Sequence, residues 1–406
     1  MGEAGVRPAR PGLGGDYWRL WASAGLSSLA DGVVKHALPL VAIVFTRSPA
    51  LIAGVSLAFT LPWLVCALPV GALVDRLDRR RAMLVAHVGR AALLAGLVLA
   101  LAFDLGSIWV LYVVAVCVGV AETVYDTAAQ SIMPQVVGRE YLARANGRLY
   151  GIELTANELV GPPLAGFLVA IGALVAFGAP VALWAVAIAG LLLLRGGFRI
   201  HREQRSTLRA DIAEGLRFLW RQRILRAFAI MVGVFNFATG AVWAVLVLYA
   251  VGPDSAMKLS TPGFGFLMAA VAMGSGVGSL LAERAERVLG RARSLAVAFG
   301  CAAVLLGIPA LTAHPLVVGT AFFVGGAGIV VANVVMVSLR QRITPDRLLG
   351  RLNSAHRLVA WGTKPLGALV GGFLAQLCGL SAVFVTMSVL VLALTVGTRV
   401  VTDEST

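Results

Sequence analysis

Acidic and basic side chains recur at helical spacing inside segments that are otherwise apolar. Asp31 and Lys35 lie four residues apart in one such segment, and Glu122 and Asp126 repeat this spacing in another. Residues at positions i and i+4 share one face of a helix. Burial favours the protonated form of a carboxyl group and a nearby cation favours the ionised form, so such groups can take up and release a proton when their surroundings change.

Further polar residues interrupt other apolar segments. Arg90 lies in the middle of its segment. Asp31 lies in the middle of another, where Lys35 is one turn away and can offset its charge. Asp31 is therefore our first candidate for proton coupling. Glu153 and Glu158 are its rivals. The alternative is that some of these acids pair with Arg90 or Lys35 and only fix helix packing. The candidate proton-binding or substrate-binding residues are Asp31, Lys35, Glu122, Asp126, Glu153, Asn157, Glu158, Asn236, Asn333 and Lys364.

The sequence contains no motif typical of an enzyme or of a metal site. It has no P-loop, no HExxH and no GxSxG, so we expect no catalytic residues, no cofactor and no use of ATP. The four cysteines stand singly in apolar segments, without metal-ligand spacing.

The elements that must position these residues are membrane-spanning helices. Hydrophobic residues make up 59% of the chain and charged residues 13%, against roughly 25% charged residues in soluble domains. A bilayer core requires about 20 apolar residues per helix. Twelve segments meet this requirement: 18–45, 50–74, 82–103, 107–130, 146–169, 173–194, 226–250, 262–282, 294–312, 315–338, 354–377 and 380–400.

The basic residues indicate how these spans are oriented. Of the 34 Lys and Arg residues, only Arg47 and Lys258 fall in loops on one side, and three lie within spans, while the rest cluster on the other side. Basic loops face the cytoplasm. We therefore expect a multi-pass protein of the inner (plasma) membrane with both termini in the cytoplasm. The net charge of +14 then reflects membrane topology, so we expect no nucleic-acid partner.

An internal repeat divides the chain into two halves. Arg144 and Asn146 in the first half correspond to Arg351 and Asn353 in the second, and the glycines of GPPLAGFL recur in GALVGGFL. We expect a six-helix half at 1–195, a cytoplasmic linker at 196–225 and a second six-helix half at 226–406. The stretch 207–222 has apolar residues at near-helical spacing between charges, which predicts an amphipathic helix on the membrane surface. Two pseudo-symmetric halves are typical of alternating-access carriers.

The stretch GALVDRLDRR resembles the loop between the second and third helices of the major facilitator superfamily. The matching residues include Gly71, Asp75, Arg76, Arg79 and Arg80, and aspartate (position 78) stands where that family usually has glycine. The stretches LARANG and GPPLAG are most similar to the drug and macrolide efflux branch of proton antiporters. Its GPxxGG signature is matched at 161, 162 and 166, with alanine in place of one glycine.

The resemblance implies an all-α membrane protein of the major facilitator fold. It implies that the motif loop holds the two halves together on the cytoplasmic side, and that spans 1, 4, 7 and 10 line a central cavity. The function it implies is proton-coupled efflux of a small amphiphilic compound by a monomer. An importer or facilitator of a metabolite in the same fold remains an alternative, as does a non-transporting membrane partner or sensor, because a fold alone does not fix a function.

Overall fold

The computed structural model describes residues 13–74, 77–194, 216–344 and 346–398. Within these ranges the chain is helical, and the one isolated β-bridge joins Val251 to Leu259. The first half contains α1 (Gly14–Phe45), α2 (Pro49–Val65), α3 (Ala67–Val74), α4 (Arg79–Ala102), α5 (Ile108–Val136), α6 (Leu142–Leu154), α7 (Gly161–Ile171) and α8 (Ala173–Leu192). The second half contains α10 (Arg223–Ala250), α11 (Thr261–Leu311), α12 (Pro315–Ile343), α13 (Asp346–Cys378) and α14 (Leu380–Gly397).

Each of the twelve expected spans falls on one helix or on consecutive helices of the described part, except that residues 399–400 of the last span lie outside the described residues. Within the described residues, ten helical segments are long and apolar enough to cross a membrane, and one of them, Arg144–Ile171, runs from α6 into α7. The 17-residue α2 is a shorter apolar helix that is followed directly by α3. The 51-residue α11 contains two of the expected spans, because Gly290 breaks its helical backbone at φ 74°. Glycine adopts this left-handed conformation without strain. The expected all-α architecture is confirmed.

The starts of several helices follow from local sequence. Ser48 and Ser260 accept hydrogen bonds from the backbone N–H three residues later, at the first turns of α2 and α11, and a proline follows each serine in the first turn. Asp78 caps α4 in the same way by accepting from the N–H of Arg81 at 3.0 Å. Its φ of −69° lies outside the left-handed region, so this turn does not require the glycine that the family usually has.

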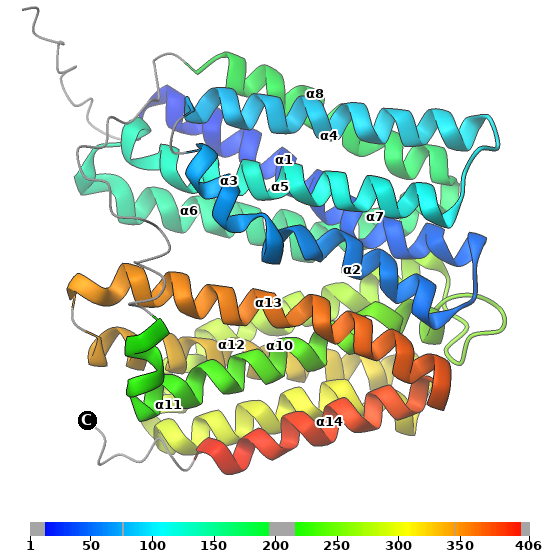
Figure 1. Ribbon diagram of the computed structural model, residues 1–406. Coiled ribbons are helices and arrows are strands. Elements are labelled where there is room, and N and C mark those ends of the chain that lie inside the picture. The colour runs from blue at the N-terminus through cyan, green and yellow to red at the C-terminus, as the bar shows by residue number, and fades with distance from the viewer. Residues whose placement is uncertain (1–12, 75–76, 195–215, 345, 399–406) are drawn as a thin grey trace, which may run out of the picture.

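The two halves lie one above the other in Figure 1, with α1–α8 in the upper half and α10–α14 in the lower half. The start of α1 and the end of α14 lie at the same end of the molecule. The largest contacts between the halves are those of α2 with α13 and of α7 with α11. The core of the described part therefore includes the seam between the halves as well as the interior of each bundle.

Several of the contacts that join the halves lie at one end, which we call the sealed end and define by Ser48, Gly166, Thr261 and Gln376. The Thr261 hydroxyl donates to the carbonyl of Gly166 at 2.8 Å, and the Ser48 hydroxyl donates to Gln376 Oε1 at 3.0 Å. A side chain at Gly166 would overlap the backbone of Thr261 and Pro262. Close backbone packing of this kind is how small residues join helices in a bilayer.

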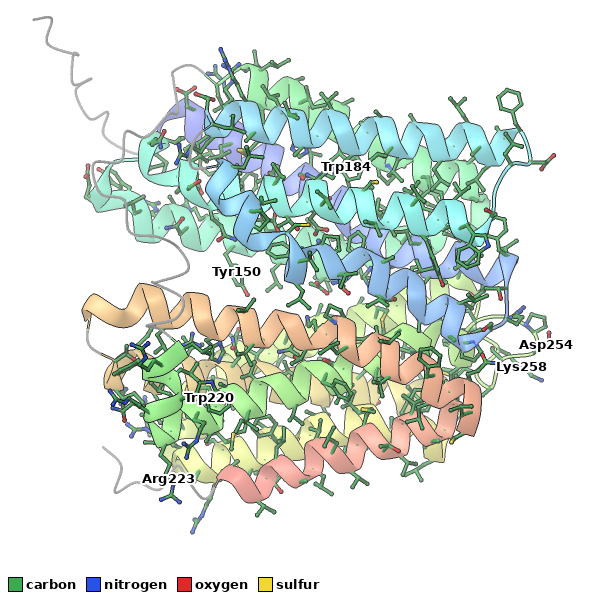
Figure 2. All side chains as sticks on the ribbon, viewed as in Figure 1. Tyr150, Trp184, Trp220, Arg223, Asp254 and Lys258 are labelled. Atoms are coloured by element: carbon green, nitrogen blue, oxygen red, sulfur yellow. The ribbon has the colours of Figure 1, made fainter. Side chains whose placement is uncertain are left out.

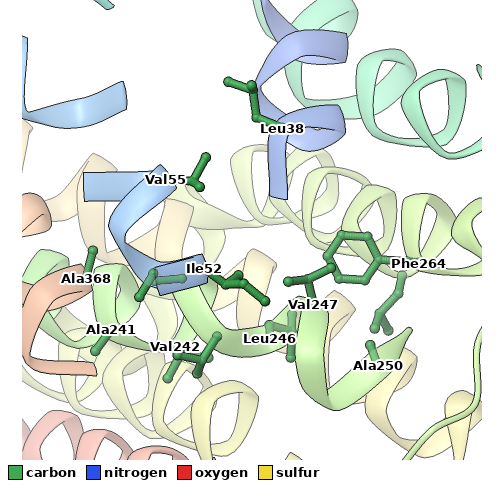
Figure 3. Close-up of a cluster of buried hydrophobic side chains, with 14 of the residues drawn as sticks. Leu38, Ile52, Val55, Ala241, Val242, Leu246, Val247, Ala250, Phe264 and Ala368 are labelled. Carbon is green, nitrogen blue, oxygen red and sulfur yellow. The ribbon is translucent and has the colours of Figure 1, made fainter. Parts of the chain in front are cut away.

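Next to the sealed end, buried apolar side chains from both halves meet. Figure 3 shows Ile52 of the first half beside residues of α10, with Val55 and Leu38 above it, and Phe264 of α11 and Ala368 of α13 at the two sides. Because the halves are in van der Waals contact here, water is excluded from this end of the seam. The cavity described below lies on the other side of this layer.

The segment between the halves is described in part. The first part of the expected amphipathic helix, up to residue 215, lies outside the described residues, whereas residues 216–221 are helical. Leu219 is buried against Leu225, Ala229 and Leu352. The described end of this segment therefore packs on the second half through its apolar residues. Figure 2 shows Trp220 and Arg223 at the end of the molecule opposite Asp254 and Lys258.

Candidate central cavity

A cavity of about 510 Å³ lies between the two halves. Eight of the residues expected from sequence line it: Asp31, Lys35, Glu122, Asp126, Glu153, Asn157, Glu158 and Lys364. Tyr150 of α6 also lines it, is 65% exposed, and points from the first half towards the second (Figure 2). The contacts described above close the seam on one side of the cavity.

Asp31 is bound by Arg90 of α4. Arg90 Nη1 donates to Asp31 Oδ1 at 2.5 Å, and the Ser27 hydroxyl donates to Asp31 Oδ2 at 3.3 Å. The Arg90 side chain is completely buried, and that of Asp31 is 9% exposed. The expected pairing of Asp31 with Lys35 is therefore replaced by the pairing with Arg90 that sequence analysis left as an alternative.

Arg90 makes several further contacts within the first half, although its Nε is buried without a hydrogen-bond partner. Its guanidinium lies 4.9 Å from the ring centroids of Tyr125 and of Trp184, and its Nη2 donates to His87 Nδ1 at 2.9 Å. A planar guanidinium suits such a site because it can stack on rings while its edge makes hydrogen bonds. Figure 2 shows Trp184 within the first half, among α1, α4 and α8. The ion pair thus ties α4 to α1 through the interior of that half.

Lys35 pairs with Glu158, a residue of another helix. Its Nζ donates to Glu158 Oε1 at 2.6 Å, and the two side chains are 43% and 42% exposed to the cavity. Glu158 lies in a wide π-helical turn, Thr155–Val160, between α6 and α7. A side chain at Gly32 would overlap the backbone of Asn157. Glycine at that position therefore lets the π-helical turn approach α1 closely enough for the ion pair.

Lys364 of α13 faces this pair from the second half. It lines the same cavity as Lys35 and Glu158 and interacts electrostatically with both. A side chain at Gly240 of α10 would overlap the backbone of Lys364, so a small residue allows α10 and α13 to pack closely here. One charged group of the second half is thereby placed opposite the charged groups of the first.

The remaining acids of the cavity are Glu122, Asp126 and Glu153. Glu122 and Asp126 lie on one continuous helix, α5, at the expected spacing of four residues. Glu122 Oε2 is buried and has no hydrogen-bond partner, whereas Asp126 has partners. Glu153 is partly buried on α6. This face of the cavity is therefore rich in carboxyl groups.

The two asparagines are not brought to the cavity. Asn236 donates from Nδ2 to the carbonyl of Val232 in its own helix, and Asn333 is exposed on α12. Neither belongs to the cavity lining. Sequence reasoning missed the apolar wall that the second half contributes, formed by Trp243, Ala244, Val247, Phe264, Met268 and Val271. Their types are those of any membrane helix, so no pattern distinguishes them before the helices are packed.

The motif loop is seen in part. Asp75 and Arg76 lie outside the described residues, and Gly71 lies in α3 with open space where a side chain would be. Arg79 is buried beside the loop, and its Nη1 donates to the carbonyl of Leu77. Arg80 donates to the last carbonyls of α8, those of Leu191 and Leu192, at 2.8 and 2.7 Å. In this state Arg80 thus binds a helix end of its own half, and the expected contact with the other half remains a prediction.

Comparisons with known proteins agree with this architecture. A family model described as transmembrane secretion effector, of the MFS type, matches residues 15–404. The multidrug efflux pump Tap of Mycolicibacterium fortuitum is 29% identical over 384 residues, which cover 90% of each chain. The enterobactin exporter EntS of Escherichia coli O127:H6 is 24% identical over 355 residues, covering 87% of this chain and 83% of EntS.

Solved structures show the same fold. A bacterial homologue of the iron transporter ferroportin, in an inward-facing state, matches with a TM-score of 0.75 at 18% identity, covering 95% of this chain and 98% of its own. The nucleoside transporter NupG matches with a TM-score of 0.73 at 12% identity, covering 95% of this chain and 99% of its own. The chain therefore belongs to the transmembrane secretion effector family of the major facilitator superfamily, and it is a multi-pass membrane transporter, not an enzyme.

Proposed function

We propose that this protein exports small amphiphilic molecules across the plasma membrane in exchange for protons. The observation that carries this proposal is the uneven wall of the cavity. The first half contributes five carboxyl groups (Asp31, Glu122, Asp126, Glu153 and Glu158), and the second half contributes the aromatic and aliphatic side chains around Trp243 and Phe264. A molecule with a cationic end and an apolar body can contact both walls.

The cavity's size and charge support this substrate class. A volume of about 510 Å³ lies within the range of about 300–1,000 Å³ that holds drug-sized ligands. Arg90 and Lys35 offset two of the five carboxyl groups by direct pairing, and Lys364 is a further cation on the opposite wall. The surplus of acidic groups favours neutral or cationic compounds over anionic ones.

The arrangement of the halves supports alternating access. Side-chain hydrogen bonds and close backbone packing join the halves at one end, and the ion pairs beside the cavity lie within the first half. One half can then rotate against the other while each bundle keeps its internal contacts. The relatives named as efflux pump and exporter support outward transport. Since the seam and the cavity are both formed by one chain, we propose a monomer.

The orientation that fits this cycle has both termini in the cytoplasm and the sealed end outside. Single cysteines at Trp220 and Asp254, which lie at opposite ends (Figure 2), test it in a variant whose four native cysteines are replaced. An impermeant thiol reagent should label Asp254→Cys in intact cells and leave Trp220→Cys unlabelled. The reverse pattern would contradict the orientation and, with it, the outward direction.

Transport itself is tested with purified protein in proteoliposomes. Tetraphenylphosphonium, a cationic amphiphile, should accumulate inside vesicles that have an acidic interior. The protein molecules whose cytoplasmic end faces outwards should carry out this uptake. Nigericin in potassium buffer, which collapses the pH gradient, should abolish the accumulation. Uptake that is faster than in protein-free vesicles but does not respond to the gradient would point to a facilitator. A compound panel with anionic amphiphiles then tests the preference for cations.

A further inference from the structure

Among the five carboxyl groups that line the cavity, the surroundings of Glu122 differ from those of the others in the described part of the chain. The charged groups that act on Glu122 are Asp31, Asp126, Arg90 and Lys35. Each cation of this set is engaged elsewhere, since Arg90 binds Asp31 and Lys35 binds Glu158. Within each of these two ion pairs the negative charge offsets the positive one, which weakens the effect of the cation on Glu122. Glu122 is thus left with Asp126, a second acid one helical turn away.

The surroundings of the Glu122 carboxyl group fit a protonated form. Oε2 is buried without a hydrogen-bond partner, and an ionised oxygen in that position would lose its hydration with nothing to replace it. A second carboxylate at i+4 adds repulsion between like charges. Both costs vanish when Glu122 carries a proton. The residue also lines the cavity, so a proton can leave it for the water there.

The other acids of the cavity have different surroundings. Asp31 accepts from Arg90 and from Ser27, and Glu158 accepts from Lys35, so both are stabilised as carboxylates. In the described part of the chain, neither Glu153 nor Asp126 has a fully buried carboxyl oxygen that lacks a hydrogen-bond partner. Asp126 also has interaction partners. In the described part of the chain, Glu122 is the acid of the cavity that has a fully buried carboxyl oxygen without a hydrogen-bond partner.

We propose that Glu122 carries the proton that the protein exchanges for its substrate. A proton from outside converts the carboxylate into the carboxylic acid, and a substrate cation entering beside Glu122 and Asp126 favours the carboxylate and displaces that proton into the cytoplasmic water. Proton and cation then compete for one site, which is the requirement for exchange. Asp31, paired with Arg90, keeps α1 and α4 in place throughout the cycle. This inference rests on the proposed proton-coupled export.

Infrared spectroscopy tests the protonation of Glu122 without any substrate. Purified wild-type protein at neutral pH should show a carbonyl stretching band of a protonated carboxyl group, which shifts in D2O. Glu122→Gln should lose this band, and the matched variants Glu153→Gln and Asp126→Asn should retain it. A wild-type protein without the band, or a Glu122→Gln variant that keeps it, would overturn the proposal.

Transport measurements separate this inference from the proposed function. If the wild type accumulates tetraphenylphosphonium under a pH gradient, Glu122→Gln should bind it and equilibrate it but lose accumulation above equilibrium. Glu122→Asp, which restores a carboxyl group, should recover part of the accumulation and also guards against a folding defect. Full accumulation by Glu122→Gln would reject Glu122 as the proton carrier while leaving proton-coupled export intact. A wild type that ignores the gradient would reject the coupling itself.

Discussion

Replacing Arg90 by methionine should destabilise the first half strongly. The side chain is completely buried and its Nη1 lies 2.5 Å from Asp31 Oδ1. For charge centres roughly 4 Å apart, an effective dielectric constant of about 20 gives an attraction of about 4 kcal/mol. Removing one partner of a buried pair costs about 3–5 kcal/mol, because the other charge stays buried without compensation. Loss of the stacking against Trp184 and Tyr125 acts in the same direction.

A double-mutant cycle measures this coupling. Asp31→Asn and Arg90→Met should each lower the free energy of unfolding by about 3–5 kcal/mol, and the double variant should lose clearly less than the sum. The assay is unfolding by sodium dodecyl sulfate in mixed micelles, followed by tryptophan fluorescence, at one fixed pH. Arg90→Lys serves as a control that keeps the charge but not the planar geometry, and should fall in between. Additive losses, or single losses below about 1 kcal/mol, the median value for exposed pairs, would refute the assignment of this pair as a structural contact.

Three further outcomes are expected. Lys35→Met and Glu158→Gln should each change the free energy of unfolding by less than about 1 kcal/mol, because their pair is half exposed, yet both should impair transport in the proteoliposome assay. Gly166→Ala should shift the protein away from the state that is closed at the sealed end, because the new methyl group would overlap the backbone of the other half. Spin-label distances across the sealed end should then lengthen. Gly276→Ala, which has open space at its site, should leave these distances unchanged. Asp78→Ala should cost about 1 kcal/mol through the lost cap of α4, and Asp78→Gly only about a few tenths; equal losses in thermal unfolding would contradict the capping role.

The helices could be predicted from sequence because each depends on local composition. The expected spans at 262–282 and 294–312 both fall on α11, but the helical backbone continues between them to Gly290. Hydropathy locates the apolar part of a helix and is silent on how far a polar helical extension reaches beyond the membrane. The π-helical turn at Thr155–Val160 was likewise not expected. A π-helical turn differs from an α-helical turn in its hydrogen-bond pattern and not in its residue types, so the composition of the segment does not predict it.

The membership of the cavity was predictable in large part, and its pairing was not. Ionisable residues within spans are costly, so their positions alone made Glu122, Glu158 and Lys364 candidates, and the structure places all three at the cavity. Which charge meets which depends on how helices rotate against each other. Asp31 and Lys35 share a helix face, yet each binds a residue of a different helix. Such contacts are tertiary, and no spacing within one segment encodes them.

The sealed end has an evolutionary consequence. Its closest contacts are made by main-chain atoms: Gly166 against Thr261 and Pro262, and Gly265 against Pro162 and Pro163. The cavity wall, in contrast, is defined by side chains. Pro162 belongs to both, but substitutions of cavity side chains away from it leave these main-chain contacts of the sealed end in place, while at Gly166 and Gly265 a larger residue is excluded by sterics. Selection can therefore change which compounds the cavity binds while the contacts that govern opening and closing of the sealed end stay the same. New substrate ranges can then arise by small steps without a change in the movement of the two halves.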